Sequence, residues 1–267
     1  MKQLEHFTGK DFIGDGWHLR PAGGATGEAY VAEQGKQKIF VKRNSSPFLA
    51  VLSAEGIVPK LLWTKRLENG DVITAQQWVN GRELKVQEMN NKRVSKLLAK
   101  IHQSEELLDM FKRMGNKPLI PQNIYRALET HVKHKQLAED AVDKALTLLE
   151  KEFPGLTESS FVVCHADVHH NNWIEDERRN LFLIDWDGAQ VADPALDLAP
   201  LLYEYVPGED WGSWIEAYGA VLTNELKYRL WWYRTIQCIE NVLWFRDRED
   251  PEAERWLAAL EELIRYK

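Results

Sequence analysis

Two short polar segments in the second half of the chain have residue types and spacing that suit phosphoryl transfer. Residues 165–172 read HADVHHNN after an apolar run, and residues 185–188 read DWDG after the next one. A loop aspartate such as Asp167 can accept the proton of an attacking hydroxyl group. Asparagine and aspartate oxygens are ligands that Mg²⁺ prefers. The D-x-x-x-x-N spacing therefore predicts Asp167 as a general base, with Asn172 and Asp185 as metal ligands.

A second interpretation of the loop histidines is a transition-metal site. Neither a cysteine cluster nor an H-E-x-x-H motif accompanies His165, His169 and His170, although zinc sites usually have such partners. Cys164 should point away from them if residues 161–164 form a strand. We therefore expect His165 to hold the loop backbone and His169 to lie near the reacting centre, and we count both as candidate catalytic residues.

A glycine-rich segment near the N-terminus could approach phosphate groups. Residues 21–27 read PAGGATG between two predicted strands, and glycines let backbone N–H groups come close to a phosphate. A plain hairpin turn is the alternative. Lys42 ends the third predicted strand, where phosphate-pairing lysines are found, although a lone lysine is often simply solvated. Because the loop precedes Lys42 and the aspartate pair follows it, we favour a nucleotide site that contains Gly23, Gly24, Thr26 and Lys42.

The elements that must position these groups change character after residue 80. The first part is predicted as an antiparallel sheet with a short helix near residues 47–54 and strands at residues 17–20, 28–32, 38–42, 60–65 and 72–78. The rest has helical periodicity at residues 91–102, 126–151, 196–205, 226–245 and 252–266. One strand–loop–strand unit interrupts it at residues 161–164, 173–174 and 181–184. We therefore predict an α+β fold with a β-rich N-lobe (residues 1–80) and a larger helical C-lobe (residues 81–267).

The motifs resemble those of the aminoglycoside phosphotransferase and choline/ethanolamine kinase family, which has a protein-kinase-like, two-lobed fold. Residues 165–172 are similar to its H-G-D-x-H-x-x-N motif, residues 184–187 to its I-D-W-[DE] and residues 98–102 to its L-A-x-L-H helix. Residues 193–199, DPALDLA, look like the segment that follows. The resemblance covers nearly the whole chain and extends to small choline-kinase-like proteins linked to cell-cycle control in Gram-positive bacteria.

The resemblance implies an enzyme that transfers the γ-phosphoryl group of ATP to a hydroxyl group of a small molecule, such as choline, ethanolamine, a sugar or an aminoglycoside-like compound. It implies ATP and Mg²⁺ as cofactors, with the roles given above for Asp167, Asn172, Asp185 and Lys42. The hinge beside adenine would be formed by Gln77, Trp78 and Val79.

Two positions depart from the family pattern. Ala166 stands where the motif has glycine, which is a mild change. Glu55 is the one carboxylate available to pair with Lys42, and it lies late for a helix, beside Gly56. The alternative function is a regulatory pseudokinase with a cell-cycle role, which would bind nucleotide or protein partners without turnover. The retained base and metal ligands oppose that alternative.

The acceptor is expected to bind in the acidic, aromatic C-terminal part. Residues 188–267 contain 15 acidic and 8 basic residues, so the whole net charge of −7 lies there. Seven of the 11 tryptophans follow residue 185, and aromatic faces can cage an ammonium group or stack on a sugar, although most should pack between helices. Candidate acceptor residues are Asp187, Tyr203, Glu240 and Trp244, of which the last two share a helix face at i, i+4 spacing. Further candidates for the pocket wall are Glu204, Trp211, Trp214, Trp231 and Trp232. We expect a neutral or cationic acceptor.

The composition excludes several other classes of protein. Hydrophobic residues make up 44% and charged residues 28% of 267 positions, as in globular proteins. No apolar run approaches the roughly 18 residues that a membrane span needs. Two cysteines fit a reduced protein better than a disulfide framework, and no apolar segment typical of a secretory signal follows Lys2. We therefore expect a cytoplasmic protein with no membrane span and, because the C-terminal part is acidic, no nucleic-acid partner.

Overall fold

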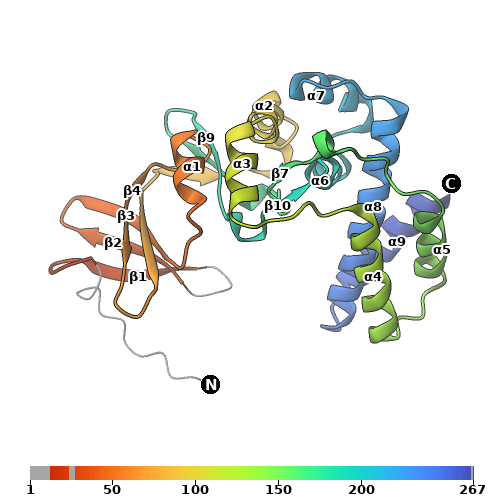
Figure 1. Ribbon diagram of the computed structural model, residues 1–267, viewed down its shortest axis with the longest axis horizontal. Coiled ribbons are helices and arrows are strands. Elements are labelled where there is room, and N and C mark those ends of the chain that lie inside the picture. The colour runs from red at the N-terminus through yellow and green to blue at the C-terminus, as the bar shows by residue number, and fades with distance from the viewer. Residues whose placement is uncertain (1–12, 24–27, 266) are drawn as a thin grey trace. The chain divides into compact units, whose positions relative to one another are not determined.

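The computed structural model describes residues 13–23, 28–265 and 267, and Figure 1 shows their helices and strands. The chain divides into two compact units. The first contains Met1–Glu83 together with Trp173–Asp187, and the second contains Leu84–Asn172 and Gly188–Lys267. The predicted α+β class, with an antiparallel sheet in the first part and helices in the second, is confirmed.

The first unit is built on a five-stranded antiparallel sheet, drawn in red to orange in Figure 1, whose strand order is β1-β2-β3-β5-β4. Its strands are β1 (His18–Gly23), β2 (Ala29–Gln34), β3 (Gln37–Arg43), β4 (Leu61–Arg66) and β5 (Val72–Gln77). All four pairs of neighbours are antiparallel. The predicted strands are therefore confirmed to within a few residues at their ends.

Alternation along β3 places Lys42 on the face opposite the core of this sheet. Ile39 and Val41 are buried, and they pack with Ala32, Ile73 and Ala75 from the neighbouring strands. Successive side chains of a strand point to opposite faces, so Lys42 cannot share the face of Val41. The hydrophobic pattern of β3 thus directs Lys42, the residue before its last, out of the core.

A short helix and a second sheet complete the first unit. Helix α1 spans Leu49–Ala54 only, because Gly56 adopts a left-handed backbone (φ +68°) just after it. Three short strands form an antiparallel sheet in the order β6-β8-β9, namely β6 (Gly81–Glu83), β8 (Trp173–Asp176) and β9 (Leu181–Leu183).

The second unit is mainly helical and contains one pair of strands. Its helices are α2 (Lys92–His102), α3 (Glu105–Arg113), α4 (Pro121–Lys135), α5 (Asp140–Lys151), α6 (Ala195–Tyr205), α7 (Trp211–Tyr218), α8 (Asn224–Arg246) and α9 (Glu252–Arg265). Figure 1 shows α9 beside α8, the longest of these helices. Among the described helices, none is both long enough and apolar enough to cross a membrane.

All three segments of the predicted strand–loop–strand unit contain strands, but these strands belong to two different sheets. Strand β7 (Val162–Cys164) pairs with β10 (Gln190–Ala192), which the sequence analysis did not predict. Strand β8 pairs instead with β6 and β9. The segment after β7 therefore connects two different sheets, and the residues on either side of it belong to different units.

The single helix predicted over residues 126–151 is wrong, because two helices occupy this stretch. Helix α4 ends where Gln136 adopts a left-handed backbone with φ of 52°. Its last turn is basic and the first turn of α5 is acidic, which suits a helix C-terminus followed by an N-terminus. Helices α3 and α7 were not predicted, although Ser104 caps α3 by accepting a hydrogen bond from the Leu107 amide.

Candidate active site

The buried carboxylate of Asp197 anchors the backbone of the loop that follows β7. Asp197 Oδ2 accepts a hydrogen bond from the His165 amide (2.7 Å), and Asp197 Oδ1 accepts one from the Ala166 amide (2.8 Å). Asp197 lies in the first turn of α6 and is fully buried. Ala166 has φ of 63°, a left-handed conformation that glycine adopts without strain. The glycine of the family motif thus has a conformational reason, and alanine in its place is more than a mild change.

A buried histidine and tyrosine fix this carboxylate in turn. His102 Nε2 donates to Asp197 Oδ2 (3.1 Å), and His102 Nδ1 lies 2.8 Å from the Tyr218 hydroxyl. Burial raises the pKa of Tyr218, so its hydroxyl keeps its proton and can donate to His102. Tyr218, His102 and Asp197 therefore form a connected path to the backbone of the loop, which sequence reasoning missed.

The same region contains the one group of three potential metal ligands found in the part of the chain that the structure describes. Polar atoms of His102, Cys164 and Asp197 lie within 4.8 Å of one another. The Cys164 thiol donates to the Asp193 carbonyl oxygen (3.3 Å), and burial raises the pKa of this thiol. Both nitrogens of His102 and both carboxylate oxygens of Asp197 are already hydrogen-bonded. The group acts as a hydrogen-bonding network and requires no metal ion.

Asp167 is presented at the exposed side of the loop. The His165 imidazole is fully buried, and its Nδ1 accepts a hydrogen bond from the Asp167 amide (3.2 Å). Asn172 Nδ2 donates to the Asp167 carbonyl oxygen (2.8 Å) and to Asp167 Oδ2 (2.9 Å). His165 is thus in place to hold the backbone, and Asn172 braces the carboxylate that we predict to be the base.

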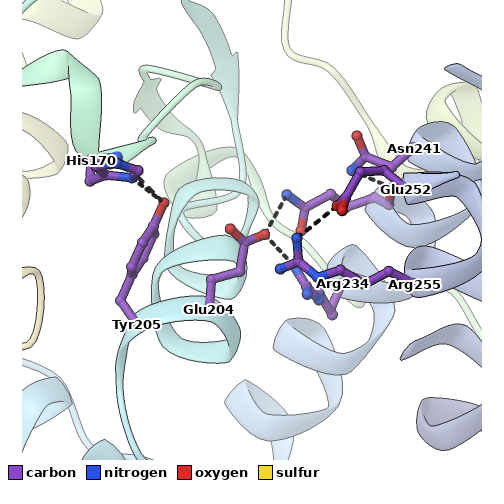
Figure 2. Close-up of polar contacts among 8 residues, drawn as sticks. His170, Glu204, Tyr205, Arg234, Asn241, Glu252 and Arg255 are labelled. Carbon is purple, nitrogen blue, oxygen red and sulfur yellow. Dashed lines mark hydrogen bonds and ion pairs between the residues drawn. The ribbon is translucent and has the colours of Figure 1, made fainter. Parts of the chain in front are cut away.

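The two following histidines lie against Tyr205, at the end of α6. His169 is exposed, and its ring centroid is 4.1 Å from that of His170. The Tyr205 hydroxyl lies 3.3 Å from His170 Nδ1, as Figure 2 shows. Burial raises the pKa of Tyr205 to about 12, and the charges of Glu204 and Asp167 add to this effect. Tyr205 therefore stays protonated at neutral pH.

In the first unit, Lys42 is paired with the two aspartates of the DWDG segment. Lys42 Nζ lies 2.7 Å from Asp187 Oδ2 and 3.5 Å from Asp185 Oδ1. Among the described residues these are its only ion pairs, so Lys42 does not pair with Glu55. Asp185 adopts a left-handed backbone with φ of 66°, a strain of the kind that clusters at functional sites.

The remaining candidates for nucleotide contacts lie in the glycine-rich segment and in the predicted hinge. Gly23 ends β1, next to an irregularity in its pairing with β2, whereas Gly24 and Thr26 lie outside the described residues. Of the predicted hinge, Gln77 ends β5, and Val79 is half-buried. The indole N–H of Trp78 donates to the Asn80 side chain, and Lys38 Nζ lies 3.8 Å from a ring centroid of Trp78.

The donor atoms that remain free suit a magnesium ion. Asn172 uses its amide nitrogen on Asp167, which leaves the carbonyl oxygen Oδ1 for another partner. The Asp185 side chain is 54% exposed, so its carboxylate is accessible. An amide oxygen and a carboxylate are hard oxygen ligands of the kind that Mg²⁺ takes while keeping several waters. The residue types therefore fit the predicted metal.

A partly buried ion pair lies beside Tyr205 in the second unit, as Figure 2 shows. Glu204 Oε1 accepts hydrogen bonds from Arg234 (2.6 Å) and from the Gln237 amide (3.4 Å). Glu204 Oε2 takes no hydrogen bond from the described residues. This oxygen belongs to the residue next to Tyr205, whose hydroxyl contacts the loop through His170.

The predicted acceptor residues of the second unit, Tyr203, Glu240 and Trp244, have different surroundings. Tyr203 contacts Trp211, with ring centroids 4.8 Å apart, and burial raises the pKa of Tyr203 to about 12. Glu240 is exposed on α8, with no hydrogen bond to the described residues. Trp244 is 55% exposed, and the Arg248 guanidinium lies 3.3 Å from its ring centroid. Of the wall candidates, Trp214, Trp231 and Trp232 are fully or nearly fully buried.

The chain matches a family model. The model, described as the phosphotransferase enzyme family, matches residues 18–231. That span includes the loop with Asp167 and Asn172, the DWDG segment and the first residues of α8.

Solved structures with the same fold are similar over nearly the whole chain. Choline kinase LicA from Streptococcus pneumoniae is 18% identical, with a TM-score of 0.66 over 94% of each chain. Spectinomycin phosphotransferase APH(9)-Ia, in complex with ADP and spectinomycin, is 14% identical, with a TM-score of 0.67 over 93% of this chain and 92% of that one. Macrolide 2′-phosphotransferase MphH from Brachybacterium faecium is 14% identical, with a TM-score of 0.64 over 91% of each chain. These similarities confirm the fold class that the sequence predicts.

Proposed function

Because the chain belongs to the phosphotransferase enzyme family, we propose that it transfers the γ-phosphoryl group of ATP to a hydroxyl group of a small molecule. The observation that carries the proposal is the exposed Asp167 carboxylate, braced by Asn172 on a loop that Asp197 holds from below. Two solved structures of similar fold contain ADP or AMP, which supports a nucleotide as the donor.

The chemistry follows from the position of the Asp167 carboxylate. Its oxygen accepts the proton of the acceptor hydroxyl as the hydroxyl oxygen forms a bond to the γ-phosphorus. The bond between that phosphorus and the β,γ-bridging oxygen breaks, and ADP leaves with the bonding electrons. Asn172 holds the carboxylate in one orientation, so less reorganisation is needed when the proton moves. A regulatory protein without turnover would need no such braced base.

Lys42, Asn172 and Asp185 supply the charges and ligands that a nucleotide requires. We propose that the Lys42 ammonium binds phosphate oxygens and that Asn172 Oδ1 and Asp185 hold Mg²⁺. The ion, when bound, neutralises charge on the phosphates. Further proposed contacts with the nucleotide are made by Gly23, Gly24, Thr26, Gln77, Trp78 and Val79. The proposed cell-cycle role and cytoplasmic location remain predictions from the sequence.

The acceptor is proposed to bind beside Glu204. Its Oε2 is free to accept a hydrogen bond from a hydroxyl or ammonium group, while Arg234 and Gln237 hold Oε1. Because Arg234 neutralises Glu204, this place suits a hydroxyl group without requiring a positive charge. An anionic acceptor has no free cation to bind there, since Arg234 is 8% exposed and already paired.

Glu240 and Trp244 offer a weaker acceptor site than the sequence suggested. Arg248 covers one face of the Trp244 ring, so an ammonium group could stack only on the other face. Glutamine substitutions at Glu204 and Glu240, on neighbouring helices, make a matched pair. We expect the substitution at Glu204 to weaken acceptor binding and the substitution at Glu240 to leave it unchanged.

A panel of hydroxyl acceptors tests the proposal. Choline, ethanolamine, sugars, nucleosides and aminoglycosides are each mixed with Mg²⁺ and ATP, and ADP release above the acceptor-free rate is measured. We expect at least one neutral or cationic acceptor to raise the rate. With it, Glu204→Gln should raise the acceptor KM and leave the ATP KM unchanged, whereas Glu240→Gln should change neither. No stimulation by any acceptor, together with no binding of ATP, would contradict the proposed function.

A further inference from the structure

Lys42 takes its closest charge partner from an unexpected place in the chain. The distance from Lys42 Nζ to Asp187 Oδ2 is 2.7 Å, whereas the distance to Asp185 Oδ1 is 3.5 Å. Asp185 is the residue with the proposed metal role. A carboxylate that binds a cation has less negative charge to offer a lysine, so Asp187 is the partner that remains available to Lys42 when Mg²⁺ is present.

The short helix of the first unit supplies no carboxylate to Lys42. Helix α1 has six residues, Leu49–Ala54, and none of them is acidic. Glu55 follows as the C-cap, and no ion pair joins it to Lys42 in the part of the chain described. The residue before the helix, Phe48, is apolar and buried. The helix therefore contributes packing to this region, and the charge must come from elsewhere.

The turn that carries Asp187 is fixed by an aromatic contact with that same helix. Trp186 lies between the two aspartates, and its ring meets the Phe48 ring edge-on, with centroids 5.8 Å apart. Its indole N–H donates to the Leu183 carbonyl oxygen (2.8 Å), at the end of β9. Since Trp186 is anchored at both places, the neighbouring Asp187 is held in a defined position beside Lys42.

We propose that Asp187 is the positioning residue for Lys42 and takes the place of a helix-borne glutamate. The proposal rests on the proposed function, because it assumes that Lys42 binds nucleotide phosphates. Lys42 has a flexible four-carbon side chain, and its side chain is 20% exposed. The Asp187 carboxylate restricts the Lys42 side chain to one conformation before the nucleotide binds.

Removing the Asp187 carboxylate should change the binding of phosphate groups and leave the stability of the fold nearly unchanged. The Asp187 side chain is 58% exposed, and exposed ion pairs contribute little to the stability of a fold. Removing the negative charge of Asp187 would by itself favour an anionic ligand. Loss of the Lys42 orientation would instead weaken the binding of an anionic ligand. Weaker ADP binding by the variant therefore indicates that Asp187 positions Lys42, whereas tighter binding indicates only an effect of its charge.

The experiment compares the binding of ADP and of adenosine to the full-length chain by calorimetry, in EDTA and again with Mg²⁺. Asp187→Asn should weaken ADP binding about tenfold, the loss of roughly one charge-assisted hydrogen bond. Adenosine has no phosphates, so its affinity should not change. Asp187→Glu keeps a carboxylate within reach and should restore most of the ADP affinity. In a Lys42→Met background, Asp187→Asn should have no further effect.

Asp71→Asn is the matched control. It removes another ion pair from the same strand, because Asp71 pairs with Arg43, the residue after Lys42. Asp71 is not placed in the nucleotide site, so this variant should bind ADP like the wild type.

The outcomes that overturn the inference are distinct from failure of the proposed function. Unchanged or tighter ADP binding by Asp187→Asn would show that Asp187 does not position Lys42. A loss that occurs only with Mg²⁺ present would show that Asp187 is a metal ligand instead. If the wild type and Lys42→Met both bind ADP no better than adenosine, the proposed nucleotide role of Lys42 fails, and the inference fails with it.

Discussion

Asn172 Nδ2 donates to two oxygens of Asp167, the backbone carbonyl at 2.8 Å and the carboxylate Oδ2 at 2.9 Å. The two contacts fix both the backbone and the side chain of Asp167. They leave Oδ1 without a hydrogen bond to the described residues, in a side chain that is exposed. A carboxylate with one oxygen braced and one free is suited to accept a proton in a defined direction.

We predict that Asn172→Asp inactivates the protein although it nearly preserves shape. The new carboxylate cannot donate to Asp167 Oδ2, and two carboxylates at this distance share a proton rather than both ionise. Turnover should fall by at least about 10² at neutral pH, and the remaining activity should need a higher pH. A pH profile of kcat measures both effects. Normal turnover at neutral pH would show that the brace is dispensable.

The buried network beneath the loop should contribute strongly to stability. Asp197→Ala leaves two loop amides and His102 without an acceptor, which should lower the free energy of unfolding by about 3 kcal/mol or more. Tyr218→Phe removes one hydroxyl from the same network and should cost about 1–2 kcal/mol. Tyr228→Phe is the control, because its hydroxyl contacts the Glu152 carbonyl near the surface. Urea unfolding measures all three. Equal effects for the two tyrosines would contradict the network.

Ala166→Gly should stabilise the fold. Ala166 has φ of 63°, and an L-residue in this region costs about 1–2 kcal/mol, which glycine avoids. Part of the gain is offset by the greater entropy of glycine in the unfolded chain, so we expect a net gain below about 1 kcal/mol. Ala258→Gly, on the exposed side of α9, should instead cost about 1 kcal/mol. Destabilisation by both substitutions would contradict the left-handed backbone at Ala166.

Asp193 should make a pH-dependent contribution to stability. Burial raises its pKa, although Arg229 partly opposes the shift, and its Oδ2 is buried with no hydrogen bond to the described residues. The folded protein then holds this proton to a higher pH than the unfolded chain, whose aspartates titrate near about 3.9. The contribution is therefore greatest at low pH and is lost as pH rises through the folded-state pKa.

Asp193→Asn removes that titration and provides the comparison. Urea unfolding of the wild type and of the variant between about pH 4.5 and 7 gives the difference in unfolding free energy at each pH. We expect the advantage of the wild type to shrink as the pH rises. A difference that stays constant, or that grows with pH, would contradict the raised pKa.

Local spacing was enough to single out the loop residues, because they are close in sequence. Asp167 and Asn172 are five residues apart in one motif, and the structure joins them by hydrogen bonds that the sequence analysis does not predict. The partner of Lys42 could not be found in this way. The sequence offered Glu55 through an analogy with longer helices, whereas the structure pairs Lys42 with Asp187, a residue more than a hundred positions away.

The pairing of the strands and the ends of the helices were not predicted, for a related reason. Hydrophobic runs predicted β7 and β8 but not that they pair with β10 and β6, since pairing depends on the whole topology. The break at Gln136 had a readable signal, a basic turn followed by an acidic one. The role of Asp197 had no signal in the sequence, because an aspartate in a helical motif does not indicate which backbone amides it will bind.

The central claim is that Asp167 is the base of a phosphotransferase, and Asp167→Asn tests it most directly. The variant is nearly isosteric and can keep its contact with Asn172, but its amide cannot take up a proton. With an acceptor that stimulates the wild type, ADP release and ATP affinity are measured side by side. The account predicts that kcat falls by at least about 10² while ATP affinity stays nearly unchanged. Near-normal turnover, or a loss that is explained entirely by weaker ATP binding, would contradict it.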